Sequence, residues 1–159
     1  MRKLIVYYSR TGRNRILAEE LQKAIGADIE EIVELKNRQG TWGYLMGGLD
    51  SFLRLKTKIK TGEVDPSDYA LTIVVAPVWL FRIPPAVRTY LTINKANFRK
   101  LALLSVSRRG DRNTKVTAEI AKIVEEPVSS ELMLNEEEFD QNKYRRKFAE
   151  FATGIVTGR

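Results

Sequence analysis

Short apolar runs that alternate with segments of helical periodicity constrain the fold of this chain more than any other feature of its sequence. The runs at residues 4–8, 71–76 and 101–106 are typical of parallel strands buried on both faces. Residues 128–134 predict another strand, and the more charged residues 29–35 predict one near an edge of the sheet. Alternation of strand and helix about five times predicts an α/β fold, a parallel sheet with helices on both faces.

The segments between these runs predict helices. An apolar stripe over residues 17–25 ends just before Gly26, which suits a helix end. Pro84 and Pro85 can open a helix, because a proline in the first turn loses no intrahelical hydrogen bond. We also expect a loop followed by a helix over residues 44–56, a turn at residues 65–68, a helix around residues 116–124 and a last helix that ends near Gly154.

Length and composition narrow the classes of function. The 159 residues suit one domain, residues 1–159. The chain has no Cys and no His, which excludes disulfides, thiolate nucleophiles, Ser-His pairs and nearly every zinc site. If the protein is an enzyme, we therefore expect a bound cofactor to supply its chemistry. No acidic cluster at a strand end suggests a metal site.

The same sequence bears on location. No apolar run approaches the roughly 20 residues that a membrane-spanning helix needs. The apolar stretch after Met1 is short and is followed by no small-residue cleavage site, so we expect no signal peptide and no membrane partner. The expected location is the cytoplasm.

The charge of the chain favours anionic partners. Lys and Arg number 27 against 20 Asp and Glu, a net charge of +7. Such an excess favours nucleotides, phosphates or acidic proteins, although charge spread over the surface for solubility explains it equally well. Nucleic acid ranks low as a partner, because the sequence shows neither a recognition helix nor paired aromatic residues. The oligomeric state is left open.

The predicted topology places a ligand site beyond the carboxyl ends of the strands, where strand order reverses. The loops that follow the first, third and fourth predicted strands are residues 9–14, 77–84 and 107–113. We therefore expect these three loops to form the site.

The first of these loops has the features of an anion site. It joins a buried strand to a helix N-terminus, where N–H groups lack partners and the helix dipole favours negative charge. Gly12 lets the backbone approach an oxygen closely. Taken alone, the loop fits an ordinary helix cap equally well, and it is neither a P-loop nor a GxGxxG turn. Short donors come from Ser9, Thr11 and Asn14, and positive charge from Arg10, Arg13 and Arg15.

Two sequence blocks resemble the flavodoxin family. Residues 8–14, Tyr-Ser-Arg-Thr-Gly-Arg-Asn, are similar to the family's phosphate loop, Ser/Thr-x-Thr-Gly-x-Thr/Asn after the first strand. Residues 75–91 are similar to its second block, in which Pro-Ile/Val-Trp-Trp-Gly is followed by prolines and Val-x-x-Phe-Leu. The blocks stand at the expected separation, and the alternation of elements covers nearly the whole chain.

The resemblance implies a flavodoxin-like sandwich with a five-stranded sheet in the order 2-1-3-4-5, a bound flavin mononucleotide (FMN) and electron transfer between redox partners. It implies that the phosphate is held by Ser9, Arg10, Thr11, Gly12, Arg13 and Asn14. One side of the flavin ring would be flanked by Pro77, Val78, Trp79, Leu80, Phe81 and Arg82, with Trp79 as the stacking aromatic. The other side would be lined by Ser107, Arg108, Arg109, Gly110 and Asp111.

The sequence also departs from the family pattern. Phe81 stands where the family often has Gly, in a turn that responds to the redox state of the flavin. The third loop offers no aromatic residue, so Arg108 could cover the ring by a cation–π contact or be solvated. Flavodoxins are usually acidic, whereas this chain is basic, which favours acidic redox partners.

Other functions and roles stay open at this point. An FMN-dependent NAD(P)H:quinone-type reductase is one alternative to a carrier, and a binding module that has lost flavin is another. We expect Trp42 and Tyr44 to pack under a long loop or to roof the pocket, and Asp111 to cap a helix or line the site. Lys56, Lys58 and Lys60 are expected on an exposed face.

Overall fold

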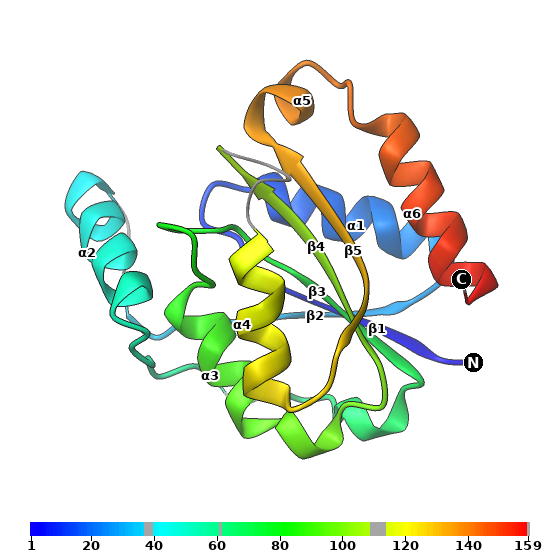
Figure 1. The fold of residues 1–159 in the computed structure, drawn as a ribbon, viewed down its shortest axis with the longest axis horizontal. Coiled ribbons are helices and arrows are strands. Elements are labelled where there is room, and N and C mark those ends of the chain that lie inside the picture. Colours follow the sequence, from blue (N-terminus) through cyan, green and yellow to red (C-terminus); the bar gives the residue numbers. More distant parts are fainter. Residues whose placement is uncertain (37–39, 61, 109–113, 159) are drawn as a thin grey trace.

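All five predicted strands pair in one parallel sheet, in the order β2-β1-β3-β4-β5, in this computed structural model (Figure 1). The structure describes residues 1–36, 40–60, 62–108 and 114–158. β3 lies between β1 and β4, as its β-branched sequence predicts, and the charged β2 lies at an edge. The strands are β1 (Lys3–Tyr7), β2 (Asp28–Glu31), β3 (Leu71–Val75), β4 (Leu101–Ser107) and β5 (Val128–Asn135).

Helices cover both faces of this sheet. They are α1 (Arg13–Ile25), α2 (Gly40–Phe52), α3 (Pro85–Ile93), α4 (Thr114–Val124), α5 (Glu136–Asp140) and α6 (Arg145–Thr157), with 3-10 turns at Pro66–Asp68 and Lys95–Asn97. α1 ends at Gly26, whose φ of 64° is left-handed, and α3 begins at Pro85. Both helix ends confirm the prediction from sequence.

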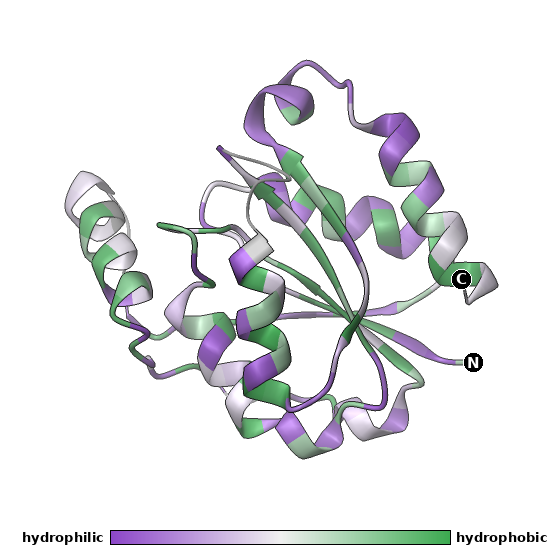
Figure 2. Ribbon diagram, in the orientation of Figure 1, coloured by the Kyte–Doolittle hydropathy of each residue, from purple (hydrophilic) through white to green (hydrophobic). Residues whose placement is uncertain are grey.

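The core consists of two apolar clusters, one on each side of the sheet. α3 and α4 contribute Val87, Leu91 and Ile120 to one cluster. α1 and α6 contribute residues such as Leu21 and Phe151 to the other. The central strands are apolar along their length in Figure 2, as strands buried on both faces must be. Because the core occupies the faces of the sheet, the carboxyl ends of the strands are left for a site.

The expected bounds of three elements are wrong. The predicted strand over residues 29–35 is only Asp28–Glu31, because the chain leaves β1 and Glu34 instead bridges Ile59 in an antiparallel sense. The helix expected over residues 44–56 is α2, Gly40–Phe52; it ends early because Arg54 takes a left-handed φ of 56°. The last helix runs past Gly154 to a left-handed Gly158. α5 was not predicted.

α2 stands at one end of the molecule, apart from the two layers that cover the sheet (Figure 1). It packs against the body mainly beside α3. Among the described helices, none is both long and apolar enough to cross a bilayer.

Candidate functional site

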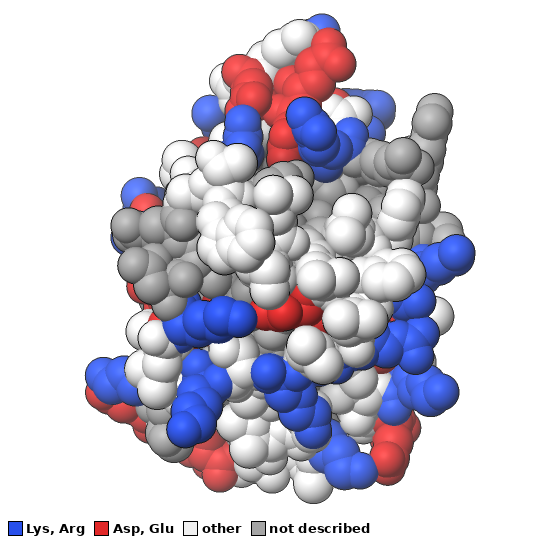
Figure 3. All heavy atoms as spheres, turned by 90° about the vertical axis from the view of Figure 1, so that its left-hand side faces the viewer, with Lys and Arg blue, Asp and Glu red and all other residues white. Residues whose placement is uncertain are grey.

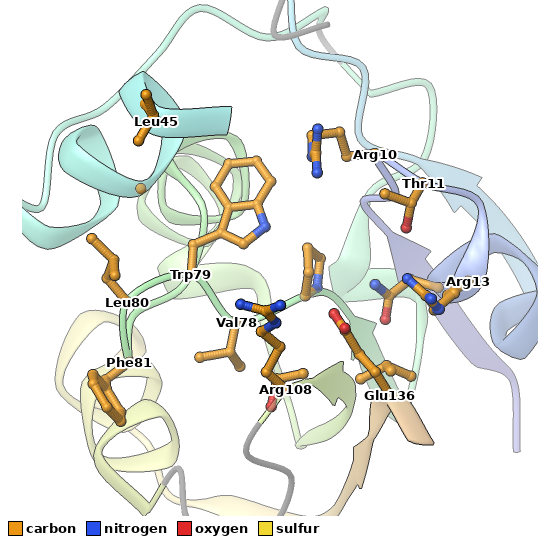
Figure 4. A pocket seen from close by; sticks show the side chains of 15 residues that line it. Arg10, Thr11, Arg13, Leu45, Val78, Trp79, Leu80, Phe81, Arg108 and Glu136 are labelled. Carbon is orange, nitrogen blue, oxygen red and sulfur yellow. The ribbon is translucent and has the colours of Figure 1, made fainter. Parts of the chain in front are cut away.

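The loops that follow β1, β3 and β4 meet around a cavity of ≈330 Å³ (Figure 4). α2 closes part of one side through Leu45 and Gly48, and Glu136 at the start of α5 closes another. Of the predicted site residues, those that line the cavity are Arg10, Thr11, Arg13, Asn14, Pro77, Val78, Trp79, Leu80, Phe81, Ser107 and Arg108. The structure thus brings together residues from all three predicted loops.

The first loop is shaped as a turn into α1. Gly12 has a φ of 92°, a left-handed conformation that costs glycine little, and a Cβ placed there would meet nothing within 4 Å. Its N–H donates to Ser9 Oγ at 3.1 Å, so Ser9 holds the turn and does not line the cavity. The helix begins at the next residue, and the N–H groups of its first turn have no acceptor inside the helix.

Asn14 is the most informative residue of this loop. Its side chain lines the cavity although the residue is only 4% exposed. Its amide Oδ1 is buried and has no hydrogen-bond partner among the described residues. A buried polar group without a partner costs about 1–3 kcal/mol. A ligand group that donates a hydrogen bond to Oδ1 would remove that cost.

The arginines of the loop do not act as one positive cluster. Arg13 forms a two-pronged ion pair with Asp140 on α5, at 3.0 and 2.9 Å, which raises its pKa mainly through the hydrogen bond. Arg15 pairs with Glu31 of β2 at 2.7 Å. Arg10 lines the cavity. Positive charge at the helix start is therefore partly neutralised, and the N–H groups in the first turn of α1 become the stronger argument for an anion.

The second loop supplies an aromatic wall. Trp79 lines the cavity and its ring meets that of Tyr8 edge to face, with centroids 5.8 Å apart. Tyr8 is itself tied down, because its hydroxyl donates to Glu34 at 2.7 Å. In Figure 4 the Trp79 side chain extends from its loop toward Arg10 and Thr11. The indole is thus a supported wall facing the anion end of the cavity.

The tip of the second loop is a strained two-residue turn. Trp79 and Arg82 exchange backbone hydrogen bonds at 2.9 and 3.0 Å, and between them Leu80 and Phe81 have φ values of 46° and 63°. Positive φ at both central positions is the geometry of tight hairpin turns that favour Asn and Gly. Leu and Phe carry a side-chain penalty there. Phe81 at the position of the family's glycine thus adopts the conformation that a glycine favours.

Arg82 is held below this turn rather than in the cavity. Its guanidinium lies 3.9 Å from Glu119 on α4, and Arg88 of α3 forms an ion pair with the same carboxylate. Arg88 and Glu119 are both buried. Arg82 does not line the cavity, so its predicted contact with a flavin stays a prediction, whereas its contact with Glu119 anchors the loop.

The third loop closes the opposite side. Ser107 and Arg108 line the cavity, and Arg108 directs its guanidinium into the same space as Trp79 (Figure 4). The predicted roles of Arg109, Gly110 and Asp111 lie outside the described residues, as does that of the Tyr44 side chain. Trp42 is 74% exposed, so its predicted packing under a loop is wrong. Lys56, Lys58 and Lys60 are exposed, as predicted.

Glu136 is a lining residue that the sequence analysis missed. It follows β5 directly and points its carboxylate into the cavity between Arg108 and Arg13 (Figure 4). The expected strand order placed the end of β5 beside that of β4, and this order could have indicated Glu136 as a residue of the site. A carboxylate here can accept hydrogen bonds from hydroxyl groups of a ligand, and it repels an anion placed too close.

The fold matches solved structures of flavoproteins. A flavoprotein from Lactobacillus acidophilus, solved in complex with FMN, is 20% identical with a TM-score of 0.70, covering 88% of this chain and 97% of that one. The chain has the flavodoxin-like fold. A candidate flavoprotein from Bacteroides eggerthii is 17% identical with a TM-score of 0.70, over 95% and 98% of the two chains.

A flavodoxin proper shares the same fold at a greater distance. Oxidised flavodoxin 1 from Bacillus cereus is 14% identical with a TM-score of 0.53, over 99% of this chain and 98% of that one. The sequence matches no protein-family model and no curated relative. The comparisons therefore establish the flavodoxin-like fold, and the case for a ligand rests on the cavity.

Proposed function

We propose that this chain binds FMN and carries electrons between redox partners. The observation that carries the proposal is a cavity with the N-terminus of α1, including Thr11 and Asn14, at one end and the supported indole of Trp79 as its opposite wall. One end of the cavity thus suits a phosphate and the other an aromatic ring. The FMN bound to the Lactobacillus flavoprotein of the same fold supports this choice of ligand.

Each part of the cavity has a distinct task in this proposal. Thr11, the Asn14 Nδ2–H and the first-turn N–H groups of α1 would hold the phosphate, and Gly12 makes the left-handed turn into the helix. Trp79 stacks against the ring, with Tyr8 fixing its orientation. Glu136 accepts hydrogen bonds from the hydroxyls of the ribityl chain, which joins phosphate and ring.

The bound flavin supplies one- and two-electron chemistry that no side chain of this protein offers. Arg108 places a positive charge in the cavity and stabilises negative charge that accumulates on reduction. The net charge of +7 extends the same effect outward, because it favours acidic redox partners and encounters that slow as salt rises. An electron carrier is thus favoured over a reductase that works alone.

The test compares FMN with riboflavin, which has the same ring and ribityl chain but no phosphate. We expect purified protein to bind FMN with a change in flavin absorbance and fluorescence, and to bind riboflavin at least about 100-fold more weakly, since charge-assisted hydrogen bonds are worth about 1.5–3 kcal/mol each. Equal affinity for the two flavins would contradict the phosphate site. Absence of binding to either would support a module that has lost flavin.

A second measurement separates a carrier from a reductase. A carrier loaded with FMN shows no steady-state oxidation of NADH or NADPH with a quinone as acceptor, whereas it passes electrons once it has been reduced chemically. Sustained oxidation of either nicotinamide would overturn the carrier proposal and leave FMN binding intact.

A further inference from the structure

The apolar stripe of α2 faces solvent rather than the body of the domain. One face of the helix carries four bulky apolar residues that are largely exposed: Trp42 (74%), Leu45 (59%), Leu49 (46%) and Phe52 (60%). On the opposite face, Gly43, Gly47 and Ser51 are buried, and Ser51 Oγ donates to the Gly47 carbonyl at 2.7 Å. A surface helix normally buries its bulky apolar residues and exposes its small polar ones. α2 does the reverse.

This face continues to the mouth of the cavity. Leu45 and Gly48 belong both to α2 and to the cavity wall. A Cβ added at Gly48 would lie 3.3 Å from Leu80 Cδ1, which shows how closely the helix meets the strained turn. Leu80 and Phe81 are themselves 56% and 39% exposed. The stripe of α2 and the tip of this turn therefore form a continuous apolar surface, larger than scattered exposed residues explain.

Basic residues border this surface. Lys36 precedes α2, and Arg54, Lys56 and Lys58 follow it, all exposed. No carboxylate of the described residues lies within ion-pair distance of Arg54, Lys56 or Lys58. The acid of α2, Asp50, is buried and paired with Lys36 at 3.1 Å. Figure 3 shows this face as a broad uncharged area with Lys and Arg along its lower side, a small acidic spot at that edge, and both acidic and basic residues above it.

We propose that this face binds an anionic lipid surface, with α2 lying in the headgroup layer, its apolar stripe directed into the bilayer, and Arg54, Lys56 and Lys58 on lipid phosphates. Helices that lie on membranes combine aromatic and leucine side chains with flanking basic charge. The length of apolar runs, from which no membrane partner was expected, bears on spanning segments and does not limit a helix that lies on the surface.

The charge and shape of the face distinguish lipid from other occupants. A second copy bound through the same face would bring two basic borders together in a two-fold contact, which is repulsive. A protein partner holds protruding anchors in shaped pockets. A fluid lipid layer accepts Trp42 and Phe52 without such pockets. On a membrane, the mouth of the cavity faces the lipid.

Sedimentation with vesicles tests the proposal, and it does not depend on bound flavin. The full chain, with and without FMN, is mixed with vesicles of phosphatidylcholine alone or with about 30% phosphatidylglycerol. Because each basic residue near an anionic surface adds about 1 kcal/mol, we expect three of them to give about 100-fold tighter binding to the anionic vesicles. We expect about 0.5 M salt to abolish most of this difference. Arg54→Gln/Lys56→Gln/Lys58→Gln should lose it as well.

The apolar part of the proposal has its own variants. Leu49→Ser/Phe52→Ser should reduce binding to anionic vesicles at least about 10-fold, since each removes a large apolar side chain from the lipid. The control Ile93→Ser/Val156→Ser removes apolar residues of comparable or greater exposure, 61% and 56%, from α3 and α6 and should bind as the parent does. In Trp79→Phe, Trp42 is the remaining tryptophan, and its emission should shift to the blue with vesicles.

Three results would overturn lipid binding. The first is no sedimentation with anionic vesicles, which would leave an acidic protein as the occupant. The second is equal binding by the parent and Leu49→Ser/Phe52→Ser, which would reduce the effect to adsorption by charge. The third is a dimer in solution that dissociates when Leu49→Ser/Phe52→Ser is introduced, which would assign the face to a second copy of the chain. If the parent protein bound vesicles but did not bind FMN, the proposed function would be refuted and the lipid-binding proposal would stand.

Discussion

At the scale of single residues, substitution of Asn14 should affect FMN binding far more than it affects the stability of the fold. Asn14 Oδ1 has no hydrogen-bond partner among the described residues, so Asn14→Ala should lower the free energy of unfolding of the FMN-free protein little. The same change should weaken FMN binding about 10- to 100-fold, because it removes the hydrogen bond that the Asn14 Nδ2–H would donate to the charged phosphate. Fluorescence titration and urea denaturation measure the two effects.

Asn94→Ala is the matched control for this prediction. The Asn94 amide donates to the Tyr90 carbonyl at 3.0 Å at the end of α3. Its loss should lower stability by about 1 kcal/mol and leave FMN affinity unchanged. If Asn14→Ala behaved in the same way, Asn14 would be a structural residue and its proposed hydrogen bond to the phosphate would be excluded.

Phe81 tests whether the turn beside the cavity is strained. Phe81→Gly removes the side-chain penalty of a left-handed φ of 63° and should raise the free energy of unfolding by about 1 kcal/mol. Phe81→Ala keeps the Cβ and removes the ring, so it should give no such gain. Urea denaturation compares the three proteins, and equal stabilisation by both changes would trace the effect to the exposed ring rather than to the backbone.

At the scale of elements, the start of α5 makes stability depend on pH. Asn135 and Glu138 form a capping box, in which each side chain bonds the backbone N–H of the other. Lys147 of α6 bonds the same carboxylate, and this bond, followed by the Asn135 N–H, lowers the pKa of Glu138 below its ordinary 4.5. Stability from the ionised carboxylate is therefore complete above pH 4.5 and is lost as pH falls through the lowered pKa.

Glu138→Gln should accordingly destabilise the protein by about 1 kcal/mol at neutral pH, and this difference should disappear in acid. Urea denaturation of the two proteins across this pH range measures the difference. Glu126→Gln, which removes an exposed carboxylate in the turn before β5, should change stability little at any pH. A difference for Glu138→Gln that grew in acid would have the wrong sign for a carboxylate stabilised in its charged form.

At the scale of the whole molecule, FMN should stabilise the fold by mass action. A ligand at about 100 times its dissociation constant adds about 2.7 kcal/mol. For a domain of this size that raises the melting temperature by roughly 5–10 °C. Differential scanning calorimetry at increasing FMN measures the rise, which should continue with the logarithm of concentration, and riboflavin at equal concentration should give little of it. A constant melting temperature would contradict specific binding to the native state.

Much of this architecture was accessible from sequence because local patterns and global fold agree. Apolar runs bounded by turns placed every strand, and the switch point placed Thr11, Trp79 and Arg108 around one site. The predicted bounds of β2 and α6 are wrong because tertiary contacts, rather than local sequence, set where these elements end. β2 is cut short where Glu34 meets Ile59, and Gly154, which suits a helix end, is enclosed in α6.

The sequence by itself determined the alternation of strands and helices, because apolar periodicity is a local property, and its resemblance to the flavodoxin family implied the strand order that the structure has. It also predicted an anion site at residues 9–14, from the N–H groups at a helix start. Only the tertiary structure decided which polar groups remain available there. It paired Arg13 with Asp140 and Arg82 with Glu119, and it brought Glu136 into the cavity. Among the described residues it left Asn14 Oδ1 without a hydrogen-bond partner. It also set the bulky stripe of α2 outward, because the body approaches that helix closely only on its glycine and serine face.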